Sequence, residues 1–327
     1  MALIGTINAS NDLGMKNRII NGNMAISQRG TGAFTQDATG TQYSLDRWNI
    51  YGSITSKFTV QQTPTTETGF ATRIDAGFTN YLGITSSSAY SVGAAEVFQL
   101  QQGIEGFNTA DLAWGTTNAK TVTLSFLVRS SLTGTFGGSL VNGAADRSYP
   151  FSYSIPVANT WTNVSVTIPG DTTGTWVGAT NGIGIRVYFG LGVGTSVSGP
   201  AGAWAGTLYR SATGAVSVVG TSGATFYITG VQLEKGSTAT AFDYRPYSTE
   251  LQLCQRYYEI GAIVFANQNV ISGSFVVPKR TTPTMVRTAS IYSGSEAGTF
   301  LSFNSITYYV TTGSTYLGGA FTANSEL

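Results

Sequence analysis

The alternation of apolar and hydroxyl-bearing residues is the sequence feature that most limits how this chain folds. It is clearest at 119–129, where every second residue from Val122 to Val128 is apolar and most residues between them are Thr or Ser. Side chains two residues apart in a strand point to the same side of the sheet. The segment is therefore predicted to form a strand of an antiparallel sheet, with one face buried and the other toward water.

Comparable segments recur along the chain, separated by positions rich in Gly and Pro. Further strands are expected at 48–51, 56–60, 147–157, 161–168, 182–191, 206–219 and 224–233. Breaks between strands are expected at Gly134, Gly137, Gly138, Pro169, Gly170, Gly192 and Gly220. Many short strands without helices between them predict an all-β fold, here a jelly-roll β-sandwich.

One segment, 248–261, lacks this alternation and is predicted to be a short helix. Thr249 and Gln252 have the spacing of a capping box at its start, and Gly261 is expected to end it. Pro246 precedes the helix and marks a domain boundary.

The predicted helix carries an apolar stripe, and a small β region follows it. Leu251, Cys254 and Tyr258 lie on one side of the helix. The region after the helix, with strands expected at 271–277 and 306–310, is small for an independent core. We therefore expect self-association that buries the stripe and the strand edges. Cys254 is expected to be a buried apolar group, with an interchain disulfide as the alternative.

The composition excludes several classes of function. The chain has no histidine, one cysteine, and 17 basic against 16 acidic residues. It therefore lacks the residues for a Ser-His-Asp triad, a histidine zinc site or an intrachain disulfide. The net charge gives no electrostatic reason to bind nucleic acid, and no apolar run is long enough for a membrane-spanning helix. Without a D-x-D-x-D run, we assign no metal ligand and no cofactor.

The acidic residues give no basis for assigning an enzyme. Glycoside cleavage requires two carboxyl groups that face each other, and the acids of this chain are scattered. We therefore assign no catalytic residue. Asp171 fits a turn-stabilising role after Pro169 and Gly170, and Glu105 is expected to be a buried, hydrogen-bonded acid.

A series of motifs in a fixed order resembles a known family. It opens with NRIINGNMAISQRGT at 17–31 and LDRW at 45–48. The later motifs are QGIEGFN at 102–108, LSFLVRSS at 124–131, IPGDTTGTW at 168–176, TGVQLEKG at 229–236, FDYRPY at 242–247, LCQRYY at 253–258 and FTANSEL at 321–327. The chain resembles tailed-phage fibre and receptor-binding proteins that carry a jelly-roll domain similar to carbohydrate-binding modules.

The resemblance implies a virion protein, made in the host cytoplasm and assembled on the particle surface. It implies a homotrimer that contacts the host surface, often its glycans. Residues 1–16 would then attach to another virion protein, 17–246 would form the sandwich, and 247–327 would form an oligomerisation or tip domain. A purely structural head fibre or decoration protein is the alternative, and a polysaccharide-degrading spike is a further one. Attachment to the tail or to the capsid stays open.

Sugar binding directs attention to aromatic rings on loops, because a pyranose has apolar C–H faces and hydroxyl edges. Trp176 and Trp204 lie in glycine-rich segments and are candidate ligand-binding residues, with Tyr209 and Asn181 as lesser candidates. The alternative for each tryptophan is that its ring folds back over one end of the core. The other three tryptophans, which are expected in the core, are Trp48, Trp114 and Trp161.

Overall fold

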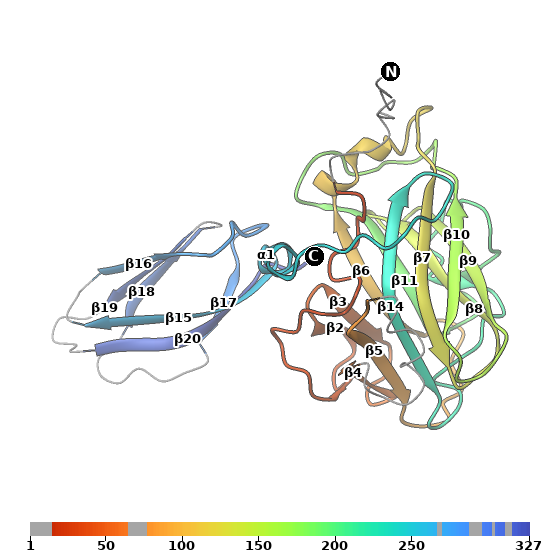
Figure 1. Ribbon diagram of the computed structural model, residues 1–327, viewed down its shortest axis with the longest axis horizontal. Coiled ribbons are helices and arrows are strands. Elements are labelled where there is room, and N and C mark those ends of the chain that lie inside the picture. Colours follow the sequence, from red (N-terminus) through yellow and green to blue (C-terminus); the bar gives the residue numbers. More distant parts are fainter. Residues whose placement is uncertain (1–14, 65–76, 267–269, 288–295, 303–304, 311–315) are drawn as a thin grey trace, which may run out of the picture.

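The protein is a two-layer sandwich with a smaller β region attached to it. The computed structural model describes residues 15–64, 77–266, 270–287, 296–302, 305–310 and 316–327. Two six-stranded sheets form the sandwich, and a helix and two three-stranded sheets follow. Figure 1 shows the small sheets extending away from the sandwich, with α1 (Tyr247–Gln255) at the junction. The predicted all-β jelly roll, followed by a short helix and a small β region, is confirmed.

The two sheets of the sandwich are antiparallel throughout their pairings. The first sheet contains, in spatial order, β1 (Phe34–Thr35), β4 (Phe58–Pro64), β5 (Asn80–Ser86), β14 (Thr225–Lys235), β7 (Val122–Ser130) and β10 (Thr162–Ile168). The second sheet contains β2 (Gly40–Leu45), β3 (Trp48–Gly52), β6 (Val97–Glu105), β11 (Ile183–Val193), β8 (Gly134–Asn142) and β9 (Ser148–Ile155).

The remaining elements are short or lie beyond the sandwich. Two 3-10 turns follow β6, and a two-residue parallel pair lies on the loop after β11; they are η2 (Gly106–Asn108), η3 (Ala110–Leu112), β12 (Ser198–Gly199) and β13 (Ser211–Ala212). One small sheet is β15 (Tyr258–Ala266), β20 (Tyr316–Asn324) and β17 (Thr284–Arg287), and the other is β16 (Val270–Ser274), β19 (Ser305–Val310) and β18 (Glu296–Leu301). No helix in the described ranges is long and apolar enough to cross a membrane.

The interior of the sandwich follows from the alternation in the sequence. Val122, Leu124, Phe126 and Val128 all point inward from β7 and are buried in the main core. Trp48 and Trp114 belong to the same core, as predicted. Trp161 is also buried, but it packs with Tyr81 and Leu127 in a separate cluster on the outward face of the first sheet.

Two expectations about strands were wrong. Gly134, Gly137 and Gly138 do not break the chain but lie within β8, and Gly192 lies within β11. Gly138 is needed there because a Cβ would lie 2.2 Å from the carbonyl oxygen of Tyr188. The segment 206–219, expected to be a strand, contributes only β13 to a ladder. It runs across the second sheet instead, with separate backbone hydrogen bonds such as Val216 N to Thr135 O at 2.8 Å.

The helix is shorter than predicted and begins differently. It ends at Gln255, and Gly261 lies in β15, where a Cβ would come 2.4 Å from the ring of Phe321. Pro246 occupies the N-cap position, and no side chain caps the helix, so the capping box does not form. The carboxylate of Glu250 is buried and forms an ion pair with Arg245 at 3.3 Å.

The apolar stripe of the helix packs inside the chain. Cys254 and Tyr257 are buried against Ile20 and Ile26, and Leu251 packs against this cluster. Tyr258 is buried at the start of β15. The stripe that we expected a second copy to cover thus has a partner within the same chain. Self-association through this region stays a prediction.

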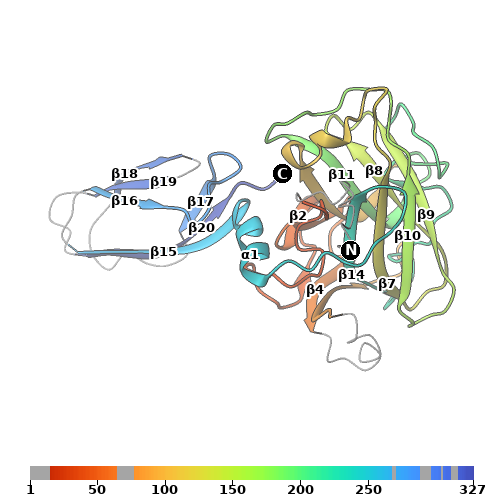
Figure 2. The ribbon, with the colours of Figure 1, turned by 45° about the horizontal axis from the view of Figure 1, so that its top comes forward.

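The residues after β20 return to the sandwich. Glu326 forms an ion pair with Arg47, which is 1 % exposed and stacks 3.5 Å over the ring of Tyr257. Glu326 also pairs with Arg29 at 3.2 Å, and the hydroxyl of Tyr43 donates to the carbonyl oxygen of Leu327 at 2.7 Å. The small β region is therefore connected to the sandwich both by α1 and by residues 325–327, an arrangement that Figure 2 also shows.

Replacing Glu326 is expected to destabilise the protein strongly. In Glu326→Gln the buried guanidinium of Arg47 loses its charged partner, and breaking such a pair costs about 3–5 kcal/mol. Lys235→Gln is the control, because both members of its ion pair with Asp111 are in contact with solvent, at 33 % and 41 % exposure, and its loss costs less than ~1 kcal/mol. Urea denaturation measures both. Equal losses in the two variants would contradict this account of the Arg47 contact.

Asp46 gives the fold a dependence on pH. Its side chain is buried and accepts two hydrogen bonds from Gln28, each 2.6 Å long. Burial raises the pKa of Asp46 from 3.8 to about 6, although the bonds from Gln28 oppose the shift. The folded chain therefore binds this proton more tightly than the unfolded chain. The contribution of Asp46 to stability is full below about pH 4 and is lost as the pH rises through about 6.

The Asp46→Asn variant tests this dependence. The free energy of unfolding of the unmodified protein should fall between pH 4 and pH 7 by about 2 kcal/mol more than that of the variant, since each pKa unit corresponds to ~1.4 kcal/mol and part of the effect is already lost at pH 4. Denaturant titrations of both proteins at the two pH values measure the difference. Parallel pH profiles would show that the Asp46 carboxyl titrates alike in the folded and unfolded chains.

Candidate functional site

The two candidate tryptophans lie together at one end of the sandwich. Trp176 and Trp204 form an edge-to-face cluster with Trp114, with ring centroids 4.7–5.4 Å apart. Both candidate rings pack against the main core. Their indole N–H groups donate within the chain, that of Trp204 to Pro169 O at 2.7 Å and that of Trp176 to Thr173 O at 3.2 Å. These contacts are those expected of rings that fold back over one end of the core. A sugar-binding role for the two rings stays a prediction.

Within the described residues, the lesser candidates form no ring contact or hydrogen bond with the tryptophan cluster. The backbone N–H of Tyr209 donates to the hydroxyl of Ser148 at 3.0 Å, on the outward side of the second sheet. Asn181 exchanges hydrogen bonds with the backbone carbonyl and the guanidinium of Arg280, at 2.9 and 3.0 Å. Asn181 therefore links the sandwich to the small β region.

The two acids singled out from the sequence are structural. Asp171 accepts two hydrogen bonds of 2.7 Å from Arg147 and one of 3.1 Å from Thr173 N, which confirms its turn role. Burial raises the pKa of Asp171, but the bonds from Arg147 and Thr173 outweigh burial and hold the pKa below its ordinary value. Glu105 is buried and hydrogen-bonded to Arg256 and Tyr257, as predicted. In the described part of the chain, no group of three or more His, Cys, Asp or Glu residues is placed to hold a metal ion.

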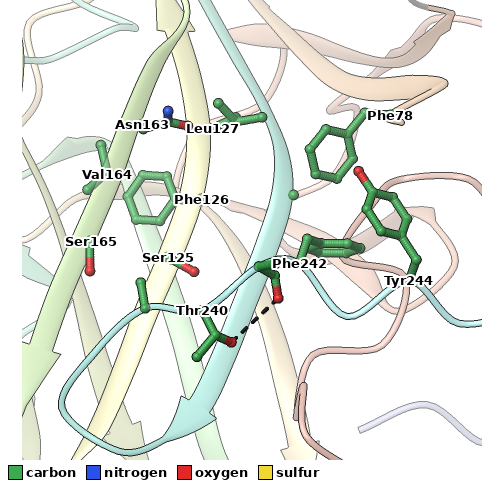
Figure 3. A pocket seen from close by; sticks show the side chains of 13 residues that line it. Phe78, Ser125, Phe126, Leu127, Asn163, Val164, Ser165, Thr240, Phe242 and Tyr244 are labelled. Atoms are coloured by element: carbon green, nitrogen blue, oxygen red, sulfur yellow. Dashed lines mark hydrogen bonds between the residues drawn. The ribbon is translucent and has the colours of Figure 1, made fainter. Parts of the chain in front are cut away.

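An open cavity of about 550 Å³ lies on the outward face of the first sheet. We call it the outer groove. One wall consists of Ser125 from β7 and of Asn163 and Ser165 from β10. The opposite side consists of aromatic rings, which we call the aromatic wall: Phe78, Phe242 and Tyr244. Figure 3 shows the two walls on either side of β14, with Thr240 between them.

The aromatic wall depends on one glycine of β14. Gly230 has a φ of +62°, and a Cβ there would lie 2.7 Å from the ring of Phe78. The missing side chain lets Phe78 lie directly on the strand. Phe242 then packs on Phe78 at 5.0 Å and on Tyr244 at 4.9 Å between centroids. Tyr244 closes the group and is 48 % exposed, so its ring is available to a ligand.

Buried polar groups hold the segment that carries the aromatic wall. Glu234 is buried and accepts hydrogen bonds from the backbone N–H of Thr240 at 2.9 Å and from its hydroxyl at 2.6 Å. Gln232 accepts a bond from Asp243 N at 2.8 Å. These contacts fix the segment 240–243 across β14, and a groove built on a fixed segment needs little rearrangement to bind.

The polar wall offers hydrogen-bonding groups to a ligand. Ser165 lies directly opposite Ser125 in the β7–β10 ladder, and Asn163 is two residues along from Ser165. Asn163 and Ser165 are exposed, and no described residue forms a hydrogen bond with any of these three side chains. No charged side chain lines the groove. The groove can therefore bind an uncharged polar molecule, and the residues that line it carry no carboxylate, ammonium or guanidinium group.

The sequence contained another indication of the outer groove, separate from the two loop tryptophans. Leu127 is apolar at a position of β7 that faces outward, and it joins Tyr81 and Trp161 in the separate outward cluster. Tyr227 on β14 extends this aromatic surface, 5.0 Å from Tyr81. Apolar and aromatic residues at outward positions of an otherwise alternating strand thus indicate a covered or binding face.

Comparisons with known proteins give fold likenesses at low similarity. No protein-family model matches the chain, and no curated protein matches it either. Among solved structures, the enzymatically active domain of bacteriophage CBA120 tailspike protein 4 aligns at 12 % identity and a TM-score of 0.34, covering 67 % of this chain and 21 % of that one. The aligned part thus covers about a fifth of that tailspike domain.

Carbohydrate-binding modules are also among the similar structures. A CBM4 module aligns at 14 % identity and a TM-score of 0.31, covering 66 % of this chain and 98 % of the module. The family 11 module of the cellulase Lic26A-Cel5E of Clostridium thermocellum aligns at 9 % identity and a TM-score of 0.28, covering 64 % and 98 %. At these scores, the function has to be argued from the residues of this chain.

Gly230→Ala is expected to disturb the outer groove. The added methyl group meets the ring of Phe78 at 2.7 Å in a conformation with positive φ, so we expect a loss of about 1–3 kcal/mol in the free energy of unfolding. Gly32→Ala is the control, because no atom lies within 4 Å of the added carbon. Thermal and urea denaturation measure both variants. An unchanged stability of Gly230→Ala would contradict the close packing of Phe78.

Proposed function

We propose that this chain is a non-enzymatic carbohydrate-binding protein and that the outer groove holds the glycan. The observation that carries the proposal is the pairing, in one open cavity of about 550 Å³, of an aromatic wall with a wall of uncharged hydrogen-bonding groups. Ligand pockets in proteins have volumes of about 300–1,000 Å³, so the groove has the size of a small-molecule site.

The two walls match the two kinds of surface on a sugar ring. The apolar C–H face of a pyranose packs on an exposed aromatic ring, here Tyr244. Its hydroxyl groups form hydrogen bonds with the side chains of Ser125, Asn163 and Ser165. Because no charged side chain lines the groove, the part of the glycan that enters it is uncharged.

We further propose that the protein is part of a phage particle and attaches it to the host surface. The support for this role is the ordered series of motifs from 17 to 258, which resembles phage fibre and receptor-binding proteins. The homotrimer and the attachment of residues 1–16 to another virion protein belong to the same proposal. Of residues 1–16, only 15 and 16 are among the described residues. The alternatives are a structural fibre without a receptor and a polysaccharide-degrading spike.

Glycan binding by groove variants tests the proposal. Tyr244→Ala and Asn163→Ala should each weaken binding to host surface polysaccharide by about tenfold, since one stacking or hydrogen-bonding contact contributes ~1–1.5 kcal/mol. Tyr247→Ala is the matched control, because Tyr247 is 65 % exposed on a nearby segment and does not line the groove. Binding is measured on a glycan array and by titration calorimetry. Full binding by both groove variants would overturn the proposal.

The same proteins separate the alternative functions. A receptor-binding protein adsorbs to host cells and blocks infection, and Tyr244→Ala should lose both effects. A purely structural protein associates with particles but not with cells. Release of reducing sugar from host polysaccharide would instead favour the degrading spike.

A further inference from the structure

The lining of the outer groove changes in character along the strands. In the β7–β10 register, Asn163 lies directly opposite Leu127, and Ser165 lies directly opposite Ser125. The two pairs are two residues apart on the same side of the sheet, which is roughly 6–7 Å along a strand. Figure 3 shows the first pair toward one end of the groove and the serine pair toward the other. We call these two places the amide end and the serine end.

The amide end places a polar group beside a small apolar surface. Leu127 and Phe78 belong to one cluster of side chains, and both line the cavity. Each is only 6 % exposed, so together they offer a contact for a group the size of a methyl rather than for a whole ring. Asn163 is exposed, and its side chain forms no hydrogen bond with another described residue. A ligand in the groove therefore reaches the amide and the apolar surface from the same cavity.

An acetamido group on a sugar has the combination of groups that this end can bind. Its amide is planar and trans, so the N–H and the methyl group lie along one edge and the carbonyl oxygen lies along the other. The side chain of Asn163 includes a carbonyl oxygen that accepts such an N–H, and the apolar surface of Leu127 lies next to it. A sugar hydroxyl has no methyl group, and an acetate ester has no N–H.

The serine end suits the hydroxyl groups of the same sugar. Ser125 and Ser165 lie opposite each other there, and neither side chain bonds to another described residue. Thr240 also lines the groove, and because its hydroxyl donates to Glu234 at 2.6 Å, its oxygen is left to accept from a ligand. No charged side chain lines the groove, so an ammonium or carboxylate group on the sugar would lose water without finding a partner.

We propose that the outer groove selects an N-acetylated amino sugar and holds its acetamido group at the amide end. The N–H of the acetamido group donates to Asn163 Oδ1, and its methyl group packs against Leu127 and Phe78. The ring hydroxyls bond to Ser125 and Ser165 at the serine end. This inference rests on the proposed glycan site and narrows its ligand to one class of sugar.

Two uncharged trisaccharides with the same backbone and linkage test the selection. Triacetylchitotriose carries an acetamido group on each ring where cellotriose carries a hydroxyl. In titration calorimetry the unmodified protein should bind triacetylchitotriose about tenfold more tightly, and Asn163→Ala should remove most of that preference. Ser165→Ala is the matched control, because Ser165 is exposed on the same strand but lies at the serine end. It should weaken both sugars alike and leave the preference unchanged.

A glycan array extends the comparison to other linkages, through pairs of glycans that differ only in an acetamido or a hydroxyl group. If binding depends on Tyr244 but the members of every pair bind alike, the groove binds glycan and this inference is overturned. A preference that Asn163→Ala leaves intact overturns it as well. If no glycan binds, or if Tyr244→Ala binds as well as Tyr247→Ala, the proposed glycan site itself fails. Thermal denaturation shows whether each variant folds.

Discussion

Each strand of the sandwich has only one face that the other sheet can bury. This constraint determines which side chains form the core and which lie on the outer surfaces. Inward residues such as Leu124 and Phe189 fill the interior, so no ligand enters between the sheets. The outward faces then carry the remaining aromatic and polar side chains. The outer groove lies on the outward face of the first sheet. The glycan site that we propose therefore lies on an outer surface of the sandwich and not between its sheets.

The sequence predicted the strands best where alternation was regular and poorly where contacts decided the outcome. The segment that became β7 was evident because its apolar residues recur at every second position. The glycines of β8 misled the prediction, because their purpose is close contact with another strand rather than a turn. The helix was located correctly, but its end was set by the pairing of β15 with β20, which the local sequence does not contain.

The candidate sites were harder to predict than the fold for a physical reason. Trp176 and Trp204 were recognisable as loop tryptophans, yet their rings pack with Trp114. The aromatic wall brings together Phe78 and Phe242, which are far apart in sequence and meet only because Gly230 leaves space between them. Such juxtapositions follow from tertiary packing, and local patterns do not encode them.

The double connection between the small β region and the sandwich has a mechanical consequence. A domain joined by a single flexible linker can rotate freely relative to its neighbour, and a force applied to it first extends the linker. Here α1 is one connection, and the contact of Glu326 with Arg47, just after the end of β20, is a second one. A force applied to the small β region is thus carried by both of these connections. With two connections, the region has less freedom to rotate relative to the sandwich than a region on a single linker would have.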